Sequence, residues 1–293
     1  MTQNLELRPA SDALGVEVLD FDAAAPLDEV TTDALRTALD EHQLLLFRDQ
    51  SLDADAQVEF VTRFGPALIE TGSGHKYQYV SNTRADGILG SGRFAFHSDH
   101  EFMDEPIDLI ALYGVEVAAD RGRTHFCNGL RAAATLPTSL RERIGERSAR
   151  HILDPDGDMD AVVARKDPLA DHLPHAMHPI LWSHPRLDKP ILYVSEQQSD
   201  KVESLPDDEG RALLEALFAH LYSPTLLYVH EWREGDLILW DNLGLQHARD
   251  ALGSEVPRTL RRVCVGGTPV IEFFRGREDR FGRMTGPDPR LDA

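Results

Sequence analysis

Short apolar runs separated by turn-forming residues constrain the fold of this chain more than any other feature. Turn signals such as Arg121-Gly122 and Glu234-Gly235 punctuate the runs. Many short strands at roughly even spacing favour a β-sandwich or jelly roll over a parallel α/β sheet. The expected strands of the middle and C-terminal parts are Lys76–Val80, Ile107–Val117, Thr124–Cys127, Pro190–Val194, Thr225–Trp232, Asp236–Trp240 and Leu260–Val265.

Helices are expected at the flanks of this mainly β chain. The N-terminal third alternates strand and helix patterns, and two later segments place apolar residues at helical spacing. The segment Ser51–Gly65 begins with a favourable N-cap sequence and ends at Gly65-Pro66, a pattern that is typical of a helix. The expected N-terminal strands are Gly15–Asp20 and His42–Gln50, and the other expected helices are Leu27–Glu41, Pro137–Gly145 and Asp207–Leu221.

One long segment, at about residues 151–180, fits neither pattern. It contains the sequence DPDGDMD, several prolines and no clean period. A long irregular segment inside a compact domain is usually functional or disordered, so we interpret it as a lid-like insertion. No internal repeat or linker divides the chain, and we therefore expect residues 1–293 to form a single domain.

Composition excludes some partners. The formal net charge of the 293 residues is −20, which disfavours binding to nucleic acid. No stretch approaches the ~20 apolar residues that cross a bilayer, and the N-terminal sequence lacks a secretory pattern. The two cysteines, Cys127 and Cys264, lie in apolar runs and are expected to be buried free thiols. We therefore expect a cytoplasmic protein that contacts neither membranes nor nucleic acid.

The sequence FAFHSDHEF contains the one His-x-Asp/Glu match in the chain, His97-Ser98-Asp99. In a strand, residues two apart point to the same face, so an imidazole and a carboxylate would project together. A second histidine would complete a facial triad for a non-haem iron. Roughly two such matches are expected by chance among thirteen histidines, so this motif alone leaves the metal interpretation open.

The segment GDLILWDNLGLQHARD offers the second histidine, His247, after an expected strand and turn. Beyond it follow Arg258 and Arg262, either of which could pair with a carboxylate in a bidentate manner. These arginines fit the capture of a small anion. A core histidine and a solvated basic strand edge explain the same residues on charge alone.

Five motifs in order resemble the taurine dioxygenase and 2,4-dichlorophenoxyacetate dioxygenase family of Fe(II)/2-oxoglutarate enzymes. They are HQLLLFRDQSLDADAQVEFVTRFGP, HSDHEF, RGRTHFCNGLRAAATLP, WDNLGLQHARD and PRTLRRV. The resemblance covers nearly the whole chain. It implies a double-stranded β-helix, the jelly roll of the cupin type, and an oxygenase that uses Fe(II), 2-oxoglutarate and O2. Related enzymes are often dimers or tetramers, so a homo-oligomer is expected by analogy alone.

The resemblance also assigns residues near the metal. It implies that His97, Asp99 and His247 bind iron. It implies that Arg258 pairs with the distal carboxylate of 2-oxoglutarate and that Thr124 hydrogen-bonds a cosubstrate carboxylate.

Three further residues are substrate-contact candidates. By resemblance, Arg262 contacts a substrate anion, and Phe102 is an aromatic side chain beside the metal strand that fits core packing equally well. His75 is the nearest candidate for the histidine that binds sulfonate in the taurine enzyme, although its spacing to His97 is shorter. Arg121-Gly122-Arg123 stands where the family often has Gly-Gly-Asp, so we expect a substrate other than taurine.

The implied reaction hydroxylates an unactivated C–H bond of a small, anionic organic substrate, with release of succinate and CO2. Desaturation, cyclisation and cleavage are alternative outcomes. A natural-product tailoring step and the catabolism of a sulfonate or aryloxy acid both stay open. Two other classes of protein also stay open: a jelly-roll protein that binds metal or ligand without turnover, and a Zn(II) hydrolase with the same ligand set.

Overall fold

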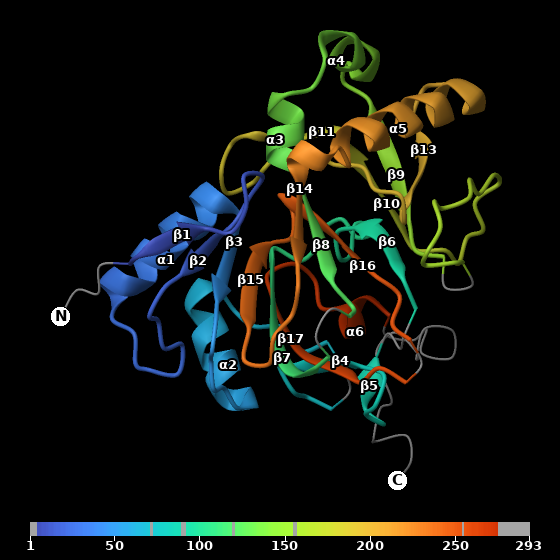
Figure 1. Ribbon diagram of the computed structural model, residues 1–293. Helices are drawn as coiled ribbons and strands as arrows, with labels where there is room; N and C mark the ends of the chain where they lie inside the picture. Colours follow the sequence, from blue (N-terminus) through green and yellow to red (C-terminus); the bar gives the residue numbers. More distant parts are fainter. Residues whose placement is uncertain are drawn as a thin grey trace.

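The largest sheet of the computed structural model forms the centre of the molecule (Figure 1). The structure describes residues 5–70, 73–88, 92–118, 121–154, 157–253 and 255–274. Most neighbouring strands of this sheet are antiparallel. In spatial order the strands are β1 (Leu7–Pro9), β2 (Val16–Val18), β3 (Leu44–Phe47), β15 (Leu237–Asp241), β7 (Leu109–Val117), β17 (Arg258–Val265), β4 (Gln78–Ser81) and β5 (Gly87–Ile88).

A second, four-stranded antiparallel sheet faces the first. Its strands in order are β14 (Leu227–His230), β8 (Thr124–Asn128), β16 (Leu245–Arg249) and β6 (Phe94–His97). Two smaller sheets lie outside this pair. They consist of β10 (His175–Pro179), β9 (Ser148–Ile152) and β13 (Ser199–Val202), and of β11 (Leu181–Ser183) with β12 (Pro190–Leu192).

Strand β15 shows why the two large sheets pack together. Side chains alternate between the faces of a strand. Leu239 points to one face and packs in the same cluster as Leu35 of the first helix. Trp240 points to the other face, where its ring meets Phe126 of β8 at a centroid distance of 5.3 Å. Both faces of β15 are therefore buried, which explains why its sequence is continuously apolar rather than alternating.

Helices cover the outer faces of the sandwich. Figure 1 shows α1 and α2 on one side of the large sheet and α3 and α5 beside the four-stranded sheet. The carboxylates of Asp28 and Asp53 cap α1 and α2 by accepting backbone N–H groups. The helices are α1 (Glu29–His42), α2 (Ala54–Val61), α3 (Gly129–Ala134), α4 (Thr138–Ile144), α5 (Asp207–Leu221) and α6 (Val270–Phe273), with short 3-10 turns η1 (Thr62–Phe64) and η2 (Pro224–Leu226).

The predicted jelly roll with flanking helices is confirmed by this arrangement. The segment expected to be a lid is not irregular at its ends: its first residues belong to β9 and its last to β10. Between the two strands, the described residues 153–154 and 157–174 form neither helix nor strand. Both cysteines are buried and free, as expected. Within the described ranges, no helix has the length and apolarity needed to span a membrane.

Candidate active site

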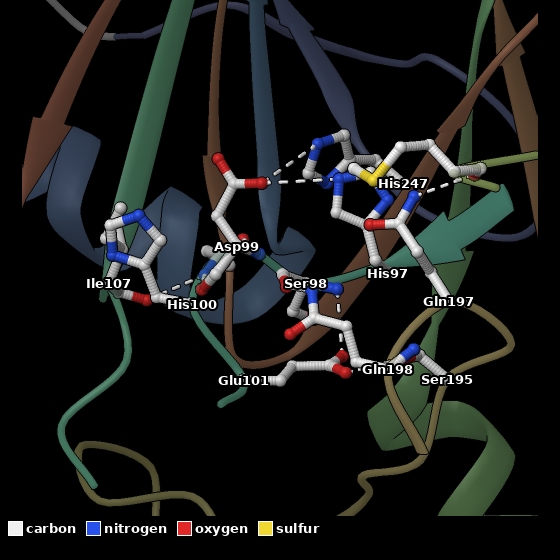
Figure 2. A network of polar contacts seen from close by, with 12 residues as sticks. His97, Ser98, Asp99, His100, Glu101, Ile107, Ser195, Gln197, Gln198 and His247 are labelled. Carbon is white, nitrogen blue, oxygen red and sulfur yellow. Dashed lines mark hydrogen bonds and ion pairs between the residues drawn. The ribbon is translucent and has the colours of Figure 1, made fainter. Parts of the chain in front are cut away.

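Two histidines meet at the edge of the four-stranded sheet. His97, the last residue of β6, lies directly opposite His247 of β16, and their ring centroids are 4.3 Å apart. One Asp99 oxygen, Oδ1, lies 3.3 Å from His97 Nε2 and 3.7 Å from His247 Nε2. Figure 2 shows the three side chains pointing toward one another. One nitrogen or oxygen of each lies within 4.8 Å of the others, which is a spacing suited to one metal ion.

The position of Asp99 corrects one step of the sequence argument. Strand β6 ends at His97, so Asp99 lies in the following turn and not in the strand. Its backbone is held by Asn242, whose Oδ1 accepts the Asp99 N–H at 2.9 Å and whose Nδ2 donates to the Asp99 carbonyl at 3.0 Å. The carboxylate therefore reaches the histidines through a contact between turns 143 residues apart in the sequence.

Hydrogen bonds and charges prepare these groups as metal ligands. A hydrogen bond from His97 Nδ1 to the Ala95 carbonyl, 2.8 Å long, leaves the Nε2 lone pair facing the carboxylate. Burial, together with the charge of His97, lowers the pKa of His247 to about 3. Burial alone would raise the pKa of Asp99, but the charge of Arg262 and the contacts with both histidines hold it well below its ordinary range. Asp99 is therefore ionised beside a neutral His247.

Arg262 of β17 holds the other oxygen of Asp99. Its Nη2 lies 2.6 Å from Asp99 Oδ2, which leaves Oδ1 toward the histidines. Its Nη1 donates to Glu70 Oε2 in a short hydrogen bond. Arg262 lines the cavity, as expected for a substrate contact, but both terminal nitrogens already face carboxylates. These contacts weigh against its predicted role as a binding group for a substrate anion.

Arg258 lies at the start of the same strand in a different electrostatic environment. It is 4% exposed, and its Nε has no hydrogen-bond partner in the part of the chain that the structure describes. No carboxylate of the described residues forms an ion pair with it. Burial, and then the charge of Arg249, lower the pKa of Arg258 to about 9. A buried guanidinium without a counter-ion is costly, so this position favours an incoming anion.

Thr124, the first residue of β8, stands beside Arg258. Its Oγ1 lies 3.4 Å from Arg258 Nη2 and accepts a hydrogen bond of 2.9 Å from Trp232 Nε1. The Trp232 indole therefore orients the hydroxyl next to the guanidinium. Arg249 of β16 also lines this region, with its guanidinium 4.4 Å from the centre of the Phe94 ring.

A cavity of about 140 Å³ connects these groups. The predicted candidate Phe102 lines it and packs with Leu153 and Val270 in one apolar cluster. His75 does not line it: the side chain is exposed and stacks on Tyr77 at 4.8 Å. The structure thus brings together all the predicted site residues except His75. The other apolar and amide side chains of the wall are Val80, Ile88, Phe94, Leu112, Met159, Trp240, Gln78, Gln197 and Gln198.

Glu101 is a buried residue beside the site that the motif did not predict. One oxygen accepts the Ser98 N–H at 2.8 Å, and the other accepts the Ser195 hydroxyl (Figure 2). The second oxygen also lies 3.2 Å from His151 Nδ1. Glu101 therefore ties the turn between His97 and Asp99 to the neighbouring sheet. Its place two residues after Asp99 was the one signal in the sequence, because two of its partners, Ser195 and His151, come from distant segments.

The sequence matches the family described as "Taurine catabolism dioxygenase TauD, TfdA family" over residues 6–264. It is 31% identical over 282 residues to the alpha-ketoglutarate-dependent 2,4-dichlorophenoxyacetate dioxygenase of Cupriavidus pinatubonensis, a match that covers 88% of this chain and 96% of that protein. It is 26% identical to the pentalenolactone F synthase of Streptomyces avermitilis, and that match covers 87% of this chain and 92% of that protein.

Among solved structures, AAD-2 in complex with Mn(II) and N-oxalylglycine superposes with a TM-score of 0.77. The sequences are 25% identical, and the match covers 91% of this chain and 98% of that one. The family match spans both sheets except for the last residue of β17, and it includes the triad, Thr124, Arg258 and Arg262. The chain therefore belongs to the TauD/TfdA family of dioxygenases that use Fe(II), 2-oxoglutarate (alpha-ketoglutarate) and O2.

Proposed function

We propose that the protein uses His97, Asp99 and His247 to bind Fe(II) and uses Arg258 with Thr124 to bind 2-oxoglutarate. The observation that carries this proposal is the buried Arg258, which has no carboxylate partner among the described residues and lines the same cavity as the triad. A dicarboxylate would supply the missing counter-ion. The two imidazoles and one carboxylate fit an iron that keeps further positions open for ligands.

The protein groups then have distinct tasks. Arg258 and the Thr124 hydroxyl fix one carboxylate of 2-oxoglutarate, and Trp232 keeps that hydroxyl in place. Arg262 holds one oxygen of Asp99 away from the metal side. The apolar wall, which includes Phe102 and Leu153, excludes water from the reacting groups. Iron, when bound with 2-oxoglutarate and O2, supplies the oxidising chemistry that releases succinate and CO2.

We further propose hydroxylation of an unactivated C–H bond in a small organic molecule as the main outcome. Apolar side chains such as Phe102, Leu153 and Val270 line the cavity beside the triad, which supports a substrate with an apolar part. Relatives named for an aryloxy acid and for pentalenolactone F support an organic carbon skeleton. A cytoplasmic location belongs to the same proposal and is supported by two cysteines that stay unpaired.

The test needs no substrate. Apoprotein is mixed anaerobically with Fe(II) and 2-oxoglutarate, and the visible metal-to-ligand charge-transfer band is titrated against the 2-oxoglutarate concentration. Arg258→Ala and Asp99→Ala are compared with Arg8→Ala, which removes an exposed arginine from a surface ion pair with Glu17. Loss of a charged hydrogen bond costs about 1.5–3 kcal/mol, so Arg258→Ala should weaken 2-oxoglutarate binding roughly 10- to 150-fold.

Arg8→Ala should leave the titration unchanged, and Asp99→Ala should abolish the band. A band that is equally strong in all four proteins would show that iron and cosubstrate bind elsewhere. Absence of a band from folded wild-type protein would favour the non-catalytic and zinc alternatives.

A further inference from the structure

The contacts of Arg262 leave little positive charge for a substrate. One guanidinium lies between two carboxylates, Asp99 on one side and Glu70 on the other, and its side chain is 9% exposed. Gln78 Oε1 adds a third acceptor at 3.5 Å from Nη1. An anion arriving at this wall of the cavity would have to displace Glu70 or meet its charge. The wall at Arg262 is therefore not built to receive a carboxylate or sulfonate.

Glu70 itself offers an unused acceptor. The residue is 4% exposed and lines the cavity. Arg262 donates to Oε2, whereas Oε1 is buried and has no hydrogen-bond partner among the described residues. His100 Nε2 lies 3.6 Å from Oε1, which is too far for a hydrogen bond. A buried carboxylate oxygen without a donor costs free energy, so this oxygen favours a ligand that brings one.

The neighbouring Cys264 does not supply that donor well. Burial raises the pKa of its thiol well above the ordinary value; the charges of Glu70 and Asp99 and a hydrogen bond with Glu70 add to this shift, and the charge of Arg262 opposes it. The thiol therefore stays protonated, but S–H is a weak donor. An ammonium, amide N–H or hydroxyl group would be a stronger partner for Oε1.

We propose that Glu70 determines specificity by accepting a hydrogen bond from an ammonium, N–H or O–H group of the substrate and by excluding an anionic group from this wall. This inference rests on the proposed iron and 2-oxoglutarate site. It departs from the expectation that Arg262 binds a substrate anion. The substrate class is thus a small, largely apolar molecule with a hydrogen-bond donor at the end that faces Glu70.

Three probes that share one skeleton test the proposal: phenoxyacetate, 2-phenoxyethanol and 2-phenoxyethylamine. They differ in the terminal group, which is an anion, a neutral donor or a cation. Each is titrated anaerobically into protein loaded with Fe(II) and 2-oxoglutarate, and the perturbation of the charge-transfer band gives a Kd. Wild type is compared with Glu70→Gln, which keeps the shape but removes the charge, and with Glu105→Gln, which changes an exposed glutamate outside the cavity.

We expect wild type and Glu105→Gln to bind the amine and the alcohol at least about tenfold more tightly than the acid. Glu70→Gln should bind the acid more tightly than wild type and the amine more weakly. Tighter or equal binding of the acid by wild type would overturn the proposal. The proposal would also be overturned if wild type and Glu70→Gln responded in the same way to all three probes, or if neither responded to any of them. A water molecule would then satisfy Oε1.

The charge-transfer band separates this failure from a failure of the iron and cosubstrate site. A band in wild type and in Glu70→Gln establishes that both proteins hold iron and 2-oxoglutarate before any probe is added. Absence of the band from wild type would count against the proposed function itself, independently of Glu70.

Discussion

Replacing Glu101 by alanine removes the acceptor that holds the turn between His97 and Asp99. Glu101 is fully buried. The change leaves the Ser98 N–H and the Ser195 O–H without this acceptor, and each unsatisfied buried donor costs about 1–3 kcal/mol. The Ser195 hydroxyl can rotate toward other groups, so we expect a total loss of about 2–4 kcal/mol in the free energy of unfolding.

Urea unfolding of the metal-free protein, followed by circular dichroism, measures this loss. The midpoint should fall with little change in the m-value, because the surface exposed on unfolding is nearly the same. The control is Glu105→Ala, which truncates an exposed glutamate and should change stability by about 0.5 kcal/mol or less. Equal stabilities of Glu101→Ala and Glu105→Ala would refute the reasoning. We also expect Glu101→Ala to bind Fe(II) more weakly, because the turn that carries Asp99 loses its anchor.

Three further predictions concern the core, pH and metal. Phe126→Ala should cost about 3–5 kcal/mol in urea unfolding, because the ring is fully buried between the sheets, whereas Val229→Ala on the exposed face of β14 should cost little. Stability of the metal-free protein should fall as pH drops below about 6.5, because the unfolded chain takes up protons that the folded one resists. His97, whose pKa is raised, opposes this trend, but more histidines have pKa values lowered mainly by burial: His100, His178, His230 and His247. Urea midpoints at pH 7 and pH 5 measure the difference, and a higher midpoint at pH 5 would contradict the argument. Fe(II) at 100 times its Kd should raise the free energy of unfolding by about 2.7 kcal/mol in wild type and not in Asp99→Ala, as measured by anaerobic thermal unfolding.

Sequence patterns predicted the central strands well because burial on both faces leaves a continuous apolar run, as in β15. They missed β9 and β10, which lie at the ends of the expected lid. The buried positions of these strands include Ala149, His151, Ala176 and His178, so small and polar side chains replace the apolar alternation. A buried strand whose inner face carries histidines has no hydrophobic period to detect.

The resemblance to the dioxygenase family, and not spacing alone, predicted which residues of the candidate site meet, but it did not predict how they are oriented. His97 and His247 lie opposite each other because β6 and β16 pair in register. Asp99 depends on Asn242, and Arg262 on Glu70, and neither contact follows from local spacing. His75 precedes β4 on an exposed segment, so proximity in sequence to the metal motif did not place it in the cavity. Contacts between segments that lie far apart in the sequence therefore determine the electrostatics of this site.

The central claim is that His97, Asp99 and His247 hold the iron. Anomalous diffraction at the iron absorption edge, from crystals grown anaerobically with Fe(II) and 2-oxoglutarate, tests it most directly. We predict one anomalous peak bounded by His97 Nε2, Asp99 Oδ1 and His247 Nε2, with 2-oxoglutarate density reaching Arg258. A peak at other side chains, or none between these three in iron-loaded crystals, would contradict the account.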